Sequence, residues 1–142
     1  LSILLVMFLV SVTCHSQEDT ALSKATARKI AGTWMQTQQS NIKGETTPAS
    51  DVLILKEDKT YTWTKTGQKK KQGGKWKTDN YSKQSNTGKM MELLILQGKQ
   101  EKKTSIFINR LTDSTLVLRR YDYSRGAPAK DDFIDLHFKR SK

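Results

Sequence analysis

The stretch KTYTWTKTG, residues Lys59–Gly67, decides the fold, because a threonine stands at every second position in it. Tyr61 and Trp63 lie between the threonines. A β-strand produces this period of two, since its successive side chains point to opposite faces. One face therefore carries small hydroxyl groups, and the other begins with two large aromatic rings. These rings either pack into a core or line a space for a ligand.

Short runs of the same kind recur along the chain, separated by polar turns that contain Gly, Asn, Asp, Ser or Lys. This succession is typical of an all-β sandwich or barrel. It predicts about eight strands, at Thr33–Ser40, Val52–Lys56, Thr60–Thr66, Gly74–Thr78, Met90–Gln97, Thr104–Arg110, Thr115–Tyr121 and Phe133–Lys139. No connection has a helical pattern, so consecutive strands should pair antiparallel. An up-and-down barrel or an open sandwich satisfies this, and the barrel leaves no exposed edge.

The N-terminal segment LSILLVMFLVSV is apolar and carries no charge. It is too short to span a bilayer as a helix and fits the apolar region of a secretory signal peptide. We therefore predict a signal peptide over residues 1–16, cleavage before Gln17, and a periplasmic or secreted protein with no transmembrane span in the mature chain. A buried N-terminal strand is the alternative.

Cys14 is the only cysteine, and it raises the question of a lipoprotein. Ser11 and Thr13 fit poorly the residues that normally precede an acylated cysteine. We therefore favour simple cleavage over lipidation. The mature chain would then have neither a disulfide nor a reactive thiol.

A short helix is predicted ahead of the first strand, in DTALSKATARKIAG, residues Asp19–Gly32. Asp19 or Thr20 can cap its start, and Gly32 ends it. Its apolar face would carry Leu22, Ala25 and Ile30. The chain thus divides into a helical lead-in, 17–31, and one β domain, 32–142, which is a size suited to a single core.

The chain is strongly basic, with 25 Lys and Arg against 14 Asp and Glu and a net charge of +11. Such a balance favours anionic partners. The basic residues are spread along the chain, however, and the densest run, Lys69–Lys71, falls in an expected turn. No nucleic-acid-binding motif accompanies them, so we expect no nucleic-acid partner.

Residues with catalytic chemistry are scarce. Of the two histidines, His15 lies in the predicted signal peptide and His137 falls on the outward side of its strand. Cys14 and His15 both lie in the predicted signal peptide, so the mature chain has no Cys–His pair. No phosphate-binding glycine loop or metal-ligand spacing is present in the sequence. We therefore expect no enzyme activity, no metal and no cofactor.

Several motifs resemble a known family. GTW, residues Gly32–Trp34, follows the predicted helix and is similar to the Gly-x-Trp signature of lipocalins. LILKEDKTYTW (Leu53–Trp63), GKW (Gly74–Trp76) and LTDSTLVL (Leu111–Leu118) resemble small exported bacterial lipocalin-like domains. The resemblance covers nearly all of Ala31–Arg140.

The resemblance implies an eight-stranded antiparallel up-and-down barrel, one short N-terminal helix and a cup that holds an apolar ligand. In lipocalins a basic residue of the last strand packs across the signature tryptophan, so Arg140 is the matching candidate to lie over Trp34. The resemblance thus gives Gly32, Trp34 and Arg140 as the structural signature. The chain departs from the family in the polar run Gln36–Gln39 and in having no disulfide.

Strand parity predicts which side chains face the cup. The candidate ligand-binding residues are Tyr61, Trp63, Leu93, Ile95, Ile106, Ile108, Leu116, Leu118 and Arg120. The rows through Ile108 and Leu118 continue into Arg110 and Arg120. Either arginine can extend to water at a rim, and Arg120 can instead pair with an anionic head group at the mouth.

The sequence therefore predicts an exported lipocalin-like barrel that binds a small apolar or amphipathic ligand, which can be anionic. The alternative is an envelope interaction or adaptor module with a filled barrel, which acts on an envelope protein partner through its basic outer surface.

Overall fold

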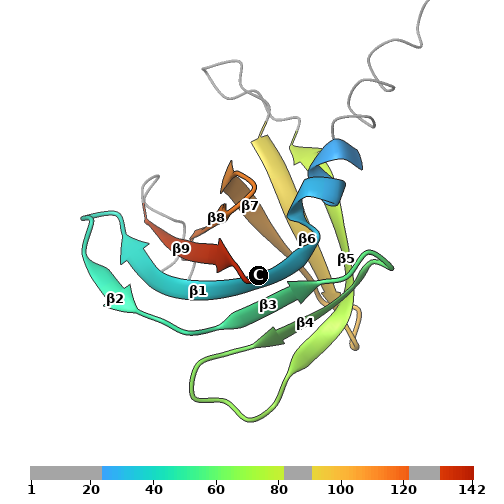
Figure 1. The fold of residues 1–142 in the computed structure, drawn as a ribbon, viewed down its shortest axis with the longest axis horizontal. Coiled ribbons are helices and arrows are strands. Elements are labelled where there is room, and N and C mark those ends of the chain that lie inside the picture. Colours follow the sequence, from blue (N-terminus) through green and yellow to red (C-terminus); the bar gives the residue numbers. More distant parts are fainter. Residues whose placement is uncertain (1–23, 82–90, 122–131) are drawn as a thin grey trace, which may run out of the picture.

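The computed structural model describes residues 24–81, 91–121 and 132–142. The predicted signal peptide, Cys14 and the proposed helix caps lie outside the described residues. Nine antiparallel strands form one sheet in the order β2-β1-β3-β4-β5-β6-β7-β8-β9, and pairing of β1 with β9 closes it (Figure 1). The protein is thus an eight-stranded barrel of β1 and β3–β9, with the short β2 added beside β1. The predicted fold class is confirmed.

The strands follow the predicted runs closely. They are β1 (Gly32–Asn41), β2 (Thr46–Pro48), β3 (Val52–Leu55), β4 (Thr60–Thr64), β5 (Gln72–Tyr81), β6 (Met91–Gly98), β7 (Lys103–Leu111), β8 (Thr115–Tyr121) and β9 (Phe133–Arg140). The sequence pattern missed β2 and made β5 too short at both ends.

A helix over residues 24–30 lies at the end of the barrel where β1 begins (Figure 1). Thr26, Ala27 and Ile30 are buried, whereas Ala25 is exposed, so the predicted apolar face was wrong at that position. Ile30 is completely buried and its carbonyl accepts a hydrogen bond from Trp34 Nε1 at 2.7 Å. Thr26 Oγ1 donates to Glu92 Oε1 at 2.8 Å, which links the helix to the start of β6.

The barrel interior holds many large side chains. Tyr61 and Trp63 face inward, as their alternation predicts, with exposed fractions of 7% and 6%. They lie opposite Leu55 and Leu53 of β3, and Trp63 makes an edge-to-face contact with Phe138 at a centroid distance of 6.3 Å. Each fully buried Leu, Ile or Phe contributes about 1.5–3 kcal/mol to folding. The rest of the core consists of Ala27 and Ile30 of the helix and of Trp34, Trp76, Leu94, Leu96, Ile106, Leu116, Leu118 and Leu136.

Arg140 packs across Trp34, its guanidinium carbon 4.2 Å from the ring centroid. Its Nη1 donates to the Ala31 carbonyl and its Nε to the Asp113 carbonyl, both at 2.7 Å. Gly32 has φ +142°, and a Cβ there would lie 2.4 Å from Arg140 Nη1. Gly32, Trp34 and Arg140 therefore fix the helix end of the barrel as one unit, and the glycine is needed for both its backbone angle and the close approach.

Strand β6 reverses one prediction. The buried side chains are Leu94 and Leu96, whereas Leu93 and Ile95 lie on the outer face and are half-buried. Leu94 stands opposite Ile106 of β7, which fixes this register. The run MELLIL is apolar on both faces, so alternation alone could not decide between them.

A β-bulge in β7 corrects a second prediction. The register shifts between Ile108 and Arg110, so that Arg110 pairs with Val117 and Leu111 pairs with Leu116. A bulge inserts one unpaired residue and reverses the facing of all that follows. Arg110 is therefore exposed on the outer face and does not continue the inner row of Ile106 and Ile108.

Candidate functional site

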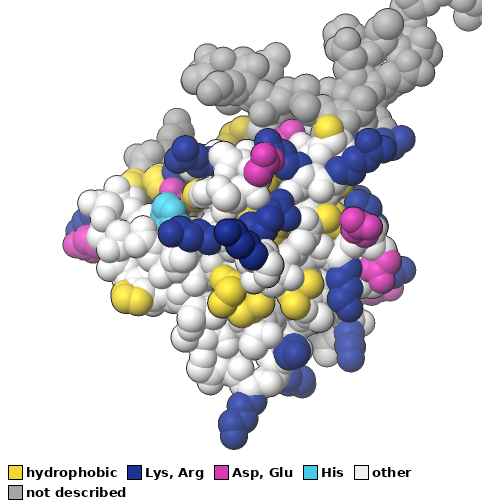
Figure 2. Space-filling view, in the orientation of Figure 1, with side chains coloured by type: hydrophobic (Ala, Val, Ile, Leu, Met, Phe, Trp, Pro, Cys, Tyr) yellow, Lys and Arg dark blue, Asp and Glu magenta, His cyan; other side chains and the backbone are white. Residues whose placement is uncertain are grey.

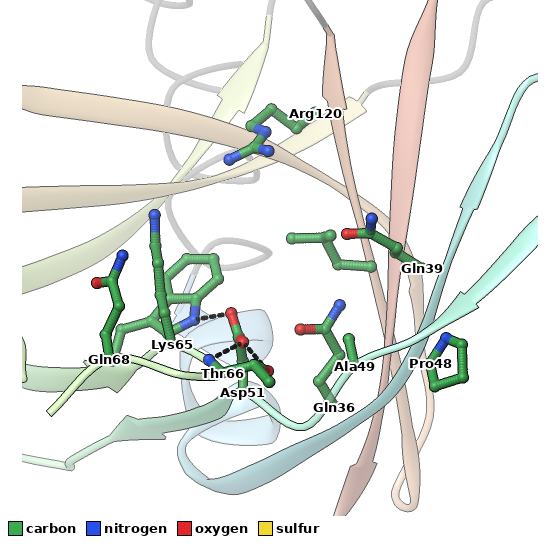
Figure 3. Close-up of a pocket in the computed structure, with 11 residues that line it drawn as sticks. Gln36, Gln39, Pro48, Ala49, Asp51, Lys65, Thr66, Gln68 and Arg120 are labelled. Atoms are coloured by element: carbon green, nitrogen blue, oxygen red, sulfur yellow. Dashed lines mark hydrogen bonds between the residues drawn. The ribbon is translucent and has the colours of Figure 1, made fainter.

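A cavity of about 320 Å³ opens at the end of the barrel opposite the helix (Figure 3). Its walls come from the end of β1, the segment before β3, the turn after β4, and the ends of β8 and β9 that lie there. The lining residues are Gln36, Gln39, Pro48, Ala49, Asp51, Trp63, Lys65, Thr66, Gln68, Arg120 and Leu136. Trp63 and Leu136 are the large apolar side chains of the lining, and most of the other lining residues are polar.

The cavity exists because the wall is broken between β2 and β3. Residues 49–51 belong to neither strand, and only the Gln36 N–H to Asp51 carbonyl bond, at 2.8 Å, and a longer bond from Ala49 N–H to the Thr37 carbonyl, at 3.4 Å, tie them to β1. Pro48, at the end of β2, has no N–H to continue the pairing.

A second bulge, in β1, supplies two glutamines to the cavity. The register shifts between Gln36 and Gln38, and Gln39 then stands opposite Leu136. Gln36 is 6% exposed and Gln39 turns inward after the bulge, so both amides face the space. Two residues of the polar run Gln36–Gln39 thus contribute to one wall of the site.

Asp51 organises the cavity floor. One carboxylate oxygen accepts the Trp63 Nε1–H at 2.9 Å, and the other accepts the Thr66 N–H and hydroxyl, each at 2.7 Å. Burial alone would raise the pKa of Asp51, but the hydrogen bonds from Thr66 and Trp63 and the charge of Lys65 together lower it. The carboxylate is therefore ionised at neutral pH and holds the indole ring in place.

Two cations border the cavity. Lys65 follows β4 directly, and its Nζ lies 5.8 Å from the Trp63 ring centroid. Arg120 comes from β8 and is exposed. Figure 3 shows the ends of the Lys65 and Arg120 side chains on the same side of the cavity. Within residues 24–81, 91–121 and 132–142, neither side chain forms an ion pair.

The structure brings Trp63 and Arg120 together, but it separates them from most of the other predicted ligand-binding residues. Ile106, Leu116 and Leu118 are buried in the core, and Ile108 packs against it. Tyr61 is buried and lines a different hollow, described below. The side chains of Leu93 and Ile95 lie on the outer face of the barrel. The site is therefore smaller and nearer the mouth than predicted.

Sequence reasoning missed Leu136, Lys65 and the Asp51–Thr66 pair. Leu136 shares parity with Phe138, and Lys65 continues the alternation of Tyr61 and Trp63, so both could have been found from the pattern. Asp51 and Thr66 lie in turns where no periodicity applies.

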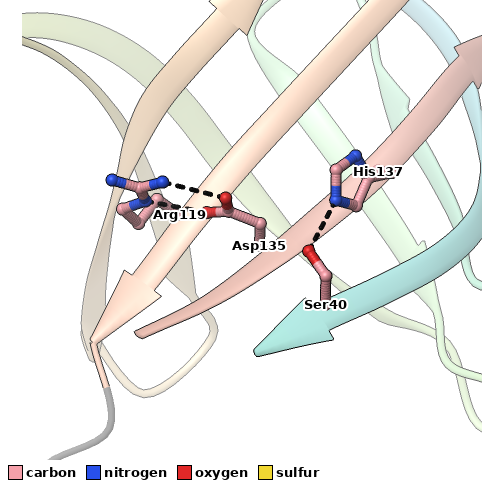
Figure 4. A network of polar contacts seen from close by, with 4 residues as sticks. All are labelled: Ser40, Arg119, Asp135 and His137. Atoms are coloured by element: carbon pink, nitrogen blue, oxygen red, sulfur yellow. Dashed lines mark hydrogen bonds and ion pairs between the residues drawn. The ribbon is translucent and has the colours of Figure 1, made fainter. Parts of the chain in front are cut away.

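A second polar group lies on the outer face of β8, β9 and β1 (Figure 4). Arg119 forms a two-point ion pair with Asp135, at 2.8 and 2.9 Å, and its guanidinium stacks on Phe133 at 3.7 Å. The hydrogen bond to Asp135 is the main cause that raises the pKa of Arg119. His137 Nε2 lies 2.8 Å from Ser40 Oγ.

A serine beside a histidine is one requirement for nucleophilic catalysis, but a third group must also orient the histidine. Both carboxylate oxygens of Asp135 bind Arg119, as Figure 4 shows. The cluster links side chains of β8, β9 and β1 across the outer face. His137 is half-buried on that face, as its parity predicts.

In the described part of the chain, no three His, Cys, Asp or Glu side chains are grouped to hold a metal ion. No helix there is long and apolar enough to cross a membrane. Comparisons with protein-family models, curated proteins and solved structures found no match.

Proposed function

We propose that this protein is an exported lipocalin-like barrel that binds a small amphipathic anion at its open end. The cavity that joins Trp63 and Leu136 to Lys65 and Arg120 is the observation that carries the proposal. An apolar body would lie on the indole ring and the leucine. The anionic group would lie between the two cations.

The charges of the site favour an anion over a cation. Asp51 already accepts hydrogen bonds on both oxygens, whereas Lys65 and Arg120 have no ion-pair partner among the described residues. The amides of Gln36, Gln39 and Gln68 can donate further hydrogen bonds to a carboxylate. A guanidinium binds a carboxylate in a two-point geometry, which suits Arg120 to this role.

The filled interior favours a short ligand. On the helix side of Trp63 the barrel is filled by Trp34, Leu53 and Phe138, each at most 1% exposed. A cavity of about 320 Å³ is at the lower end of the range for ligand pockets, ~300–1,000 Å³. Each methylene buried on binding contributes about 0.8 kcal/mol, so a medium-length chain suffices for measurable affinity.

The test compares octanoate with octanol, which share a tail and differ in charge. We expect octanoate to bind more tightly by calorimetry, and Arg120→Gln to weaken octanoate about tenfold while leaving octanol unchanged, since a charge-assisted bond is worth ~1.5 kcal/mol at a partly exposed site. Arg110→Gln, an exposed arginine on the outer face, is the matched control. Equal binding of both ligands to every variant would contradict the proposed role of Arg120, and no binding of either would contradict the function.

Export is the second part of the proposal, and it depends on the apolar segment before Gln17. The mature protein should begin at Gln17 when its N-terminus is sequenced from a native source. Recovery of a diacylated Cys14 would instead place it on a membrane.

A further inference from the structure

A second hollow, of about 570 Å³, lies between the turn after β4 and the turn after β6. Both turns are at the open end of the barrel. Four lysines line it, two from each turn: Lys70, Lys71, Lys99 and Lys102. Tyr61, Gly73 and Gly98 form part of its wall. It adjoins the cavity described above, since Gln68 borders both.

The four lysines are exposed, and none of them forms an ion pair with another described residue. Glu101 lies in the same turn as Lys102 but does not line the hollow. In Figure 2, Lys and Arg side chains occupy the lower end of the molecule, where Figure 1 draws the connection from β4 to β5, with no Asp or Glu side chain visible beside them. Like charges gathered in a concave site attract an anion strongly.

The shape and chemistry of the hollow select among anionic partners. The turns, KTGQKKK (65–71) and GKQEKK (98–103), contain no apolar side chain that could insert into a bilayer. Both β5 and β6 are paired on each side, so no free edge is available for a peptide strand to extend the sheet. A flat membrane and an extended acidic peptide therefore fit poorly.

Uncharged donors and acceptors line the hollow together with the ammonium groups. The amides of Gln68, Gln72 and Gln100 and the hydroxyl of Thr104 also line the hollow. Lysine supplies a compact charge without a fixed two-point geometry, which suits anionic groups spaced along a chain. Amides and hydroxyls suit a ligand that also carries many hydroxyl groups.

We propose that this lysine-lined hollow binds an acidic polysaccharide, a sugar chain that carries carboxylate or sulfate groups. The ammonium groups meet the anionic substituents and the amides meet the sugar hydroxyls. None of the four lysines lines the small-anion cavity, so either assignment can fail without the other.

The experiment measures binding of the mature protein to polygalacturonate by calorimetry at low and moderate salt. The test variant combines Lys70→Gln, Lys71→Gln, Lys99→Gln and Lys102→Gln. The control variant combines Lys24→Gln, Lys29→Gln, Lys56→Gln and Lys139→Gln, all of which are exposed and away from the hollow. Both variants have the same net charge, so only the position of the charges differs.

We expect the affinity for polygalacturonate to fall about tenfold or more in the test variant and by less than about threefold in the control. Each exposed charge pair contributes little, but the contributions of several pairs add up. Octanoate binding should be unchanged in the test variant. An equal loss of affinity in both variants would overturn the proposal in favour of net charge alone. Failure of the wild type to bind polygalacturonate would also overturn it. Equal or tighter binding of polyglutamate, or of anionic lipid vesicles, with the same loss in the test variant, would overturn it in favour of a peptide or a membrane.

Discussion

Replacing Arg140 with methionine tests how the helix end of the barrel is held. The guanidinium donates to the carbonyls of Ala31, Asp113 and Lys29 and lies over the Trp34 ring. Methionine keeps an apolar stem over the indole but removes the charge and every donor. The change therefore isolates the polar contribution from the packing one.

The expected cost follows from these contacts. The part-buried bond to Ala31 is worth about 1–1.5 kcal/mol, and water partly replaces the exposed bonds to Lys29 and Asp113, which leaves about 0.5 kcal/mol each. The cation–π contact with Trp34 adds about 0.5–1 kcal/mol. Arg140→Met should therefore lower the free energy of unfolding by about 2.5–3.5 kcal/mol, or the melting temperature by roughly 10 °C for a domain of this size.

Urea unfolding followed by tryptophan fluorescence and circular dichroism measures this change, with an unchanged slope expected because the fold is kept. Arg120→Met is the matched control, because Arg120 is exposed at the opposite end of the barrel and should change stability by less than about 0.5 kcal/mol. A loss in Arg140→Met no larger than in the control would refute the view that Arg140 fastens the helix end.

Three further predictions concern stability. Gly74→Ala should destabilise the fold by about 1–3 kcal/mol or more, because the added Cβ would lie 1.9 Å from the Gln97 carbonyl oxygen. Gly98→Ala is the control in the same urea assay and should be near neutral, because no atom lies within 4 Å of its added Cβ. Trp34→Ala should cost about 3–5 kcal/mol, since Trp34 is 0% exposed; a cost within error would mean that Trp34 is not part of the core. The pKa of Asp51 in the folded protein lies below its ordinary 3.8. The ionised carboxylate therefore contributes its full stabilisation of the fold above about pH 5, and this contribution is lost as the pH falls through the lowered pKa. The difference in unfolding free energy between wild type and Asp51→Asn should shrink over that interval, and a constant difference would contradict the network.

The strand pattern was readable because most inward residues alternate with polar ones. Tyr61 and Trp63 could be placed inside from sequence alone. Alternation failed at β6, where Leu93 and Leu94 are both apolar and only pairing with β7 chooses between them. It failed again at Arg110, because a bulge leaves no mark in the sequence that a period of two can detect.

The candidate site was harder to predict, because it depends on places where regular pairing stops. The cavity comes from the break at 49–51 and from the bulge that turns Gln39 inward. The lysine-lined hollow joins turns centred near Lys70 and Lys99, which lie far apart in sequence and meet only because β5 pairs with β6. Parity did indicate Arg120 at the mouth, since that residue continues the inner row of Leu118 in a strand without a bulge.

The most direct measurement uses the three tryptophans of the chain as separate reporters. Each indole N–H has its own partner: Trp34 donates to the Ile30 carbonyl, Trp63 to Asp51 and Trp76 to the Lys56 carbonyl. Trp63 borders the cavity, and the other two lie toward the helix end. Titration of ¹⁵N-labelled protein with octanoate should shift the Trp63 indole resonance progressively and leave those of Trp34 and Trp76 in place. Equal shifts in all of them, or no shift of the Trp63 resonance, would contradict binding at the open end of the barrel.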